Sequence, residues 1–99
     1  MSDLNSDLRL AVDTGKTDIG HRDVLRAINQ HKAKAIVIAD KGMKDMADDI
    51  LHMSSIAELK VIRFNGNSME LGSVCGKPYS VNSLAIIEPG NSNILNEEY

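Results

Sequence analysis

The feature of this sequence that most constrains its fold is a run of five apolar residues, Ala35–Ala39, whose three central residues are β-branched. Its length and its β-branched content favour a strand over a helix. Because no position in the run is polar, the strand is expected to be buried on both faces of its sheet. Lys41 and Gly42 follow shortly after the run and are expected to end it.

Helix-like and strand-like segments alternate along the rest of the chain. Apolar residues recur with helical spacing at 4–12, 24–28 and 43–51. Asn67 and Glu70 have the spacing of a capping box and predict a short fourth helix that ends at Gly76. Further strands are expected at 17–19, 61–64 and 83–87. This alternation predicts an α/β fold in which helices cover both faces of a small four-stranded sheet. We expect a three-layer α/β/α sandwich whose central sheet is mixed.

Size and composition are those of one soluble globular domain. The chain has 99 residues, of which 42% are hydrophobic and 25% are charged, and a chain of this length builds a single core. We therefore expect one domain over residues 1–99, with the polar segment 91–99 frayed. The sequence lacks both the ~20-residue apolar run that spans a bilayer and the basic and hydrophobic stretches of a signal peptide. The protein is accordingly expected in the cytoplasm, with no membrane contact.

Charge is distributed unevenly along the chain. The formal net charge is −3 and the sequence pI is about 5.5, values that taken alone count against a nucleic-acid-binding protein. Residues 16–44, however, hold seven Lys or Arg against three Asp, and residues 60–80 hold three basic residues against one acidic residue. Residues 45–59 carry four acidic residues and no Lys or Arg. The two basic windows predict one positive face if folding brings them together.

The sequence lacks the motifs that would indicate an enzyme. It contains neither the glycine-rich loops that hold nucleotide phosphates nor the GxSxG motif of serine hydrolases. His21, His31 and His52 do not have the spacing of metal ligands. The single cysteine, Cys75, offers no partner for an internal disulfide and is expected to be a small buried residue. We therefore expect no catalysis, no small-molecule substrate, no cofactor and no metal.

Three loops beside the predicted strands carry residue types that suit an RNA contact. Residues 20–23 place a glycine and Arg22 at the start of a helix, where free backbone amides attract phosphate. Residues 40–42 follow the buried strand. Residues 76–81 combine a lysine, a proline, Tyr79 and a valine, a surface on which an unpaired base can stack. Each loop taken singly fits an ordinary turn better, but in such a sandwich the three are expected to share one edge of the sheet.

Five segments together resemble a known family. They are DTGK at 13–16, Gly20, KAIVIA at 34–39, NSMELG at 67–72 and GKPYSVNSLAIIEPG at 76–90. In order and spacing they are similar to the L-thirty-e family of large-subunit ribosomal proteins of archaea and eukaryotes, within the superfamily that binds kink-turn RNA. The resemblance runs from about Leu4 to Leu95. The short chain, without terminal extensions, favours an archaeal member.

The resemblance implies a set of RNA-contacting residues on the same three loops. Gly20 would allow close backbone approach, Arg22 occupies a position that is commonly Lys or Arg, and Tyr79 would pack on a base with Val81 beside it. The full set that we expect to bind RNA is Gly20, His21, Arg22, Lys41, Gly42, Lys77, Pro78, Tyr79, Ser80 and Val81.

Two residues depart from the family pattern. Lys41 stands where members commonly have an Asn that reads a guanine edge, and Asp23 stands where Ser or Lys is usual. Recognition of RNA shape and backbone is therefore expected to be retained more fully than discrimination between bases.

The leading hypothesis is a structural protein of the large ribosomal subunit that binds a kink-turn in rRNA and contacts neighbouring ribosomal proteins in the cytoplasm. One alternative is a free kink-turn-binding protein of guide-RNA particles or of mRNA regulation. An alternative of a different class is a protein-interaction module that uses the acidic helix 43–54.

Overall fold

The computed structural model of the 99-residue chain describes residues 3–41, 44–97 and 99. Helices and strands alternate along the chain in the predicted order. The elements are α1 (Leu4–Thr14), β1 (Lys16–Ile19), α2 (His21–Asn29), β2 (Ala35–Ala39), α3 (Lys44–Ile56), β3 (Lys60–Phe64), α4 (Ser68–Val74) and β4 (Ser83–Glu88). None of the described helices is long and apolar enough to cross a membrane.

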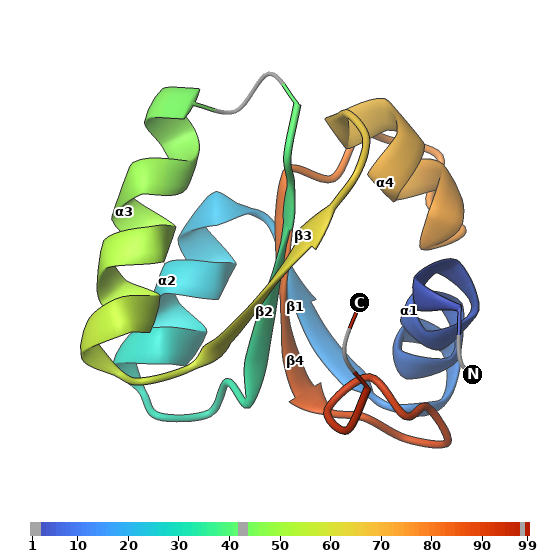
Figure 1. Cartoon of the computed structure of the whole chain (residues 1–99), viewed down its shortest axis with the longest axis horizontal. Coiled ribbons are helices and arrows are strands. Elements are labelled where there is room, and N and C mark those ends of the chain that lie inside the picture. Colours follow the sequence, from blue (N-terminus) through green and yellow to red (C-terminus); the bar gives the residue numbers. More distant parts are fainter. Residues whose placement is uncertain (1–2, 42–43, 98) are drawn as a thin grey trace.

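The four strands form one mixed sheet in the order β1-β4-β2-β3. β4 runs antiparallel to both of its neighbours, β1 and β2, whereas β2 and β3 are parallel. Helices α2 and α3 cover one face of this sheet, and α1 and α4 cover the other (Figure 1). The predicted three-layer α/β/α sandwich is therefore confirmed.

The two central strands form the middle of the hydrophobic core. All five residues of β2 are buried, as the apolar run Ala35–Ala39 predicts, and the first five residues of β4 are buried as well. The outer strands β1 and β3 keep partly exposed positions. A strand that has a helix layer on each side excludes water from both of its faces, which is why its sequence shows no alternation of polar and apolar residues.

Helix α4 begins at the predicted capping box. The backbone N–H of Glu70 donates to the Asn67 side chain over 2.9 Å, and the Glu70 carboxylate accepts from the Asn67 N–H over 3.2 Å. The helix ends at Val74, and Gly76 follows with a φ of +75°. This left-handed conformation favours glycine, and it turns the chain away from the helix axis.

Described residues of the C-terminal segment contact the domain. Ile94 has 0% exposure within the core. On α1, the buried carboxylate of Asp7 accepts hydrogen bonds from the Asn93 N–H over 3.5 Å and from the Tyr99 hydroxyl. These contacts place the segment beside α1 (Figure 1).

Candidate nucleic-acid interface

The sheet topology brings the three candidate loops to one end of the molecule. Because β4 is antiparallel to its two neighbours, its first residues lie beside the last residues of β1 and β2. The Gly20 N–H donates to the Ser83 carbonyl over 3.0 Å, and the Ala39 N–H donates to the Asn82 carbonyl over 3.0 Å. The loops that follow β1 and β2 and the loop that precedes β4 therefore leave the sheet together, at the top of Figure 1.

A fourth loop, residues 65–67, lies at the same end and was missed by reasoning from the sequence. β3 is parallel to β2, so both strands end there. The Asp40 N–H donates to the Phe64 carbonyl over 2.9 Å, and the Lys41 N–H donates to the Gly66 carbonyl over 3.1 Å. The Asp40 carboxylate also lies 3.2 Å from the Arg63 guanidinium. A prediction that β2 and β3 are parallel neighbours would have placed this loop beside the loop that follows β2.

Gly20 gives the first loop its geometry. Its φ of +107° and ψ of 152° place it at the N-cap of α2 in a conformation open to glycine alone. A Cβ built on it would meet no atom within 4 Å, so the space above the backbone is open. Gly20 has no side chain that could cap the first-turn amides of α2. An anion can therefore approach these amides directly.

The side chains of this first loop differ in what they contact. Arg22 is exposed to solvent. Asp23 lies 3.5 Å from Arg26, one turn further along α2, and both groups are more than half exposed. His21 points back toward α3, with its Nε2 3.6 Å from the Asp49 carboxylate. Of these residues, Arg22 offers its whole guanidinium to a ligand.

The loop before β4 presents an aromatic ring to solvent. Tyr79 is 56% exposed, Pro78 and Ser80 are exposed, and Lys77 is partly exposed. Val81 is 1% exposed and belongs to the core, so the apolar contact to a base that was expected from Val81 is not available at the surface.

Helix α4 holds this loop in place. The Val81 N–H donates to the Ser68 carbonyl and the Lys77 N–H donates to the Gly72 carbonyl, each over 2.9 Å. At Gly72 the helix touches the loop so closely that a Cβ would lie 2.1 Å from the Tyr79 carbonyl oxygen. Gly72 is therefore a supporting residue of the interface that was missed from the sequence, where a glycine within a predicted helix was the available signal.

The remaining predicted residues are placed as follows. Lys41 is exposed directly after β2, while Gly42 lies outside the described residues. Cys75 is 1% exposed, and burial raises the pKa of its thiol despite the opposing charges of Lys77 and Arg9. Among the described residues there is no group of three metal-ligating side chains.

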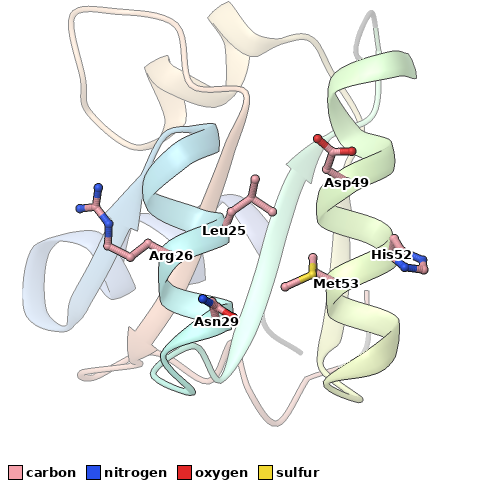
Figure 2. A pocket seen from close by; sticks show the side chains of 6 residues that line it. All are labelled: Leu25, Arg26, Asn29, Asp49, His52 and Met53. Atoms are coloured by element: carbon pink, nitrogen blue, oxygen red, sulfur yellow. The ribbon is translucent and has the colours of Figure 1, made fainter.

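A separate groove of about 560 Å³ runs between α2 and α3. Figure 2 shows Leu25 of α2 and Met53 of α3 pointing into the space between the two helices. The groove carries both signs of charge, because Arg26 of α2 and Asp49 of α3 both line it. The described part of the acidic helix 43–54 keeps Asp48 and Asp49 exposed.

Comparison with known proteins gives relatives that match nearly the whole chain. Residues 2–96 match the model of the ribosomal protein L7Ae/L30e/S12e/Gadd45 family. The chain is 42% identical over 93 residues to large ribosomal subunit protein eL30 of Methanosphaera stadtmanae, with 94% of this chain and 95% of that protein covered. It is 39% identical over 94 residues to large ribosomal subunit protein eL30 of Methanococcus maripaludis, with 95% and 89% covered.

A solved structure has the same fold at low sequence identity. It is described as a protein with unknown function from Bacillus halodurans, and it superimposes with a TM-score of 0.80 at 18% identity. The superposition covers 96% of this chain and 94% of the other. At this identity the similarity is one of fold.

Proposed function

This chain belongs to the ribosomal protein L7Ae/L30e/S12e/Gadd45 family, and we propose that it is a structural protein of the large ribosomal subunit that binds a kink-turn in rRNA through the loops at one end of its sheet. It acts in the cytoplasm as part of the ribosome, with rRNA and neighbouring ribosomal proteins as its partners. The proposal includes no catalytic step and no cofactor.

The main support for this proposal is that the loops after β1 and β2 lie beside the loop before β4. Each loop contributes a different means of binding. The open Gly20 backbone and the α2 amides suit a phosphate, Arg22 and Lys41 supply exposed positive charge, and Tyr79 supplies a stacking surface. A sharply bent RNA presents closely spaced phosphates and unstacked bases together, so a compact cluster of this composition fits it.

Charge explains how a protein with a net charge of −3 can bind RNA. Three cations of the basic windows, Arg22, Lys41 and Lys77, belong to the loops at this end of the sheet, whereas Lys34 and Lys60 lie at the opposite end. Asp48 and Asp49 lie on α3 and Glu58 follows it, outside those loops. Association with RNA depends on the local potential at the contact surface, which is screened over about 10 Å at 0.1 M salt.

The experiment is a gel shift of the full chain against a kink-turn RNA hairpin and an unbent duplex of equal length. We expect binding of the hairpin with clear preference over the duplex. Equal affinity for the two RNAs would refute kink-turn recognition. Absence of binding to both RNAs would favour the protein-interaction alternative.

A kink-turn-binding protein of guide-RNA particles, or a regulator of mRNA, would use the same loops. Sequencing the RNA that co-purifies with the protein from its own cells separates these functions. We expect large-subunit rRNA, and guide RNA or mRNA in its place would replace the ribosomal function while leaving the interface unchanged.

A further inference from the structure

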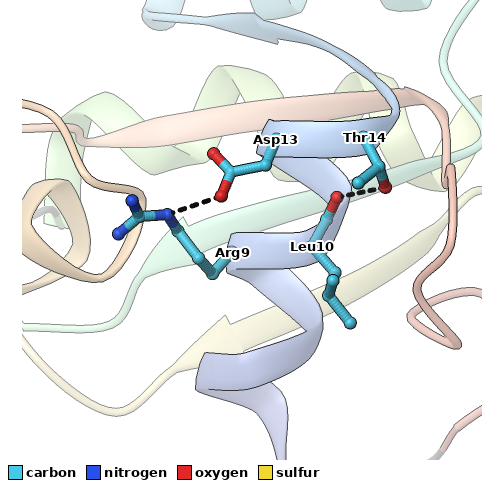
Figure 3. A network of polar contacts seen from close by, with 4 residues as sticks. All are labelled: Arg9, Leu10, Asp13 and Thr14. Atoms are coloured by element: carbon cyan, nitrogen blue, oxygen red, sulfur yellow. Dashed lines mark hydrogen bonds and ion pairs between the residues drawn. The ribbon is translucent and has the colours of Figure 1, made fainter.

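Arg9 of α1 lies directly over the backbone of Gly76, at the beginning of the loop that carries Tyr79. A Cβ built on Gly76 would lie 2.7 Å from Cζ, 2.8 Å from Nη1 and 3.1 Å from Nη2 of the Arg9 guanidinium. Any side chain at residue 76 would therefore displace the guanidinium. Figure 3 shows Arg9 reaching away from α1 toward the segment that follows α4.

The guanidinium keeps most of its donors free. Its Nε donates to the Asp13 carboxylate over 2.8 Å, in an ion pair whose two side chains are 55% and 51% exposed (Figure 3). Within the described part of the chain, Nη1 and Nη2 make no hydrogen bond. Exposed ion pairs of this kind contribute little to stability. Arg9 is thus held in position and still has its outer edge available to an acceptor.

Lys77 supplies a second positive charge at the residue that follows Gly76, the residue that Arg9 covers. The fields of Lys77 and Arg9 both act on the Cys75 thiol, which lies between α4 and Gly76 in the sequence. Lys77 is anchored through its backbone N–H to the Gly72 carbonyl over 2.9 Å. Two cations from distant parts of the chain, Arg9 and Lys77, therefore meet at one short segment, and Lys77 lines a surface pocket together with the exposed Tyr79.

We propose that Arg9 and Lys77 form an additional phosphate-binding position, which extends the RNA contact beyond the sheet-end loops onto α1. This inference rests on the proposed RNA-binding function and adds a residue, Arg9, that lies on none of those loops. A guanidinium with two free amino groups on one edge suits a phosphate, because it can donate two parallel hydrogen bonds. The proposed ligand is a backbone phosphate of the same RNA that contacts Tyr79.

A purely structural role for Arg9 is the competing explanation. The last carbonyls of α4 carry partial negative charge, and a nearby guanidinium stabilises such a helix end. The two roles differ in what they predict. A structural role changes the melting temperature and leaves the salt dependence of RNA binding unchanged, whereas a phosphate contact changes the salt dependence.

The test measures the affinity of the full chain for a kink-turn hairpin at several salt concentrations, for the wild type and for Arg9→Gln. Each phosphate contact contributes ~0.7–0.9 to the slope of log K against log salt. We expect Arg9→Gln to lower the slope by about that amount and to weaken binding at 0.1 M salt by roughly three- to tenfold. Lys34→Gln is the control, because Lys34 is an exposed lysine at the opposite end of the sheet, before β2, and should leave the slope unchanged.

Asp13→Asn supplies a second, independent variant in an exposed position. It removes the carboxylate that competes for Arg9, so we expect tighter binding at low salt, and this gain should disappear when Arg9 is also changed to Gln. If the wild type binds the hairpin while Arg9→Gln keeps the full slope, the additional position is refuted and the sheet-end interface stands. If the wild type does not bind the hairpin, the proposed function itself fails.

Discussion

Gly72→Ala tests how the interface is supported, because it changes a residue that would not touch RNA. The new Cβ would lie 2.1 Å from the Tyr79 carbonyl oxygen and 3.2 Å from the Tyr79 carbonyl carbon. Both are backbone atoms, so no side-chain rotation can relieve the overlap. The loop has to retreat from α4 by about 1.3 Å or more to reach an ordinary contact distance. The Lys77 N–H hydrogen bond to the Gly72 carbonyl is strained by the same movement.

The expected magnitudes follow from this displacement. Overpacking costs ~1–3 kcal/mol, and alanine recovers about 0.5–1 kcal/mol relative to glycine within a helix. A net loss of about 1–2 kcal/mol corresponds to a fall of the melting temperature by roughly 4–15 °C for a domain of this size. RNA affinity should fall about tenfold, since the stacking of a base on an aromatic ring is worth ~1–3 kcal/mol and Tyr79 moves with the loop.

Thermal unfolding by circular dichroism and hairpin binding by fluorescence anisotropy, measured well below the melting temperature, test both quantities. Ser73→Ala is the matched control, because it introduces the same residue at the next, exposed position of α4. It should change neither quantity. An unchanged melting temperature and an unchanged affinity for Gly72→Ala would refute the account that α4 holds the Tyr79 loop.

Three further predictions concern single side chains. Arg22→Ala should weaken hairpin binding by about 1.5–3 kcal/mol, the range for hydrogen bonds to charged groups. The melting temperature should be unchanged, because the Arg22 side chain is exposed. A variant that unfolds would show that Arg22 has a structural role instead. Asp23→Asn should tighten hairpin binding at low salt, because it removes a negative charge from a phosphate site and releases Arg26. The expected cost is at most about 0.3–1 kcal/mol of helix stabilisation. Unchanged or weaker binding would show that Asp23 faces away from the RNA. Tyr99→Phe should lower the melting temperature through loss of the hydrogen bond to Asp7. Because burial and that bond raise the pKa of Tyr99, the difference in melting temperature from wild type should persist below pH ~10 and vanish as the pH rises well above it. A difference independent of pH would contradict this role.

The fold could be predicted from the sequence because its strongest signals are local. The unbroken apolar run Ala35–Ala39 required a strand buried on both faces, and the Asn67–Glu70 spacing fixed the start of α4. The contacts of the C-terminal segment could not be predicted, because they depend on burial of Ile94 and on a distant carboxylate, Asp7. Local composition carries no information about such a long-range partner.

The candidate site was predictable in its position and less so in its details. The alternation of strands and helices placed the loops at one edge, where the structure brings them together. Two features depended on distances that a sequence does not contain. Val81 faces the core rather than the surface, and Gly72 is needed for close contact between α4 and the Tyr79 loop.

The most direct test of the central claim is to locate the RNA on the protein by amide chemical-shift mapping, with a kink-turn hairpin added to the isotope-labelled chain. We expect the largest shifts at the amides of Gly20, His21 and Arg22, together with shifts at Lys41 and in residues 77–80. The α2–α3 groove around Leu25 and Met53 should show little change. Shifts concentrated in that groove, with the loops at the end of the sheet unaffected, would contradict the account.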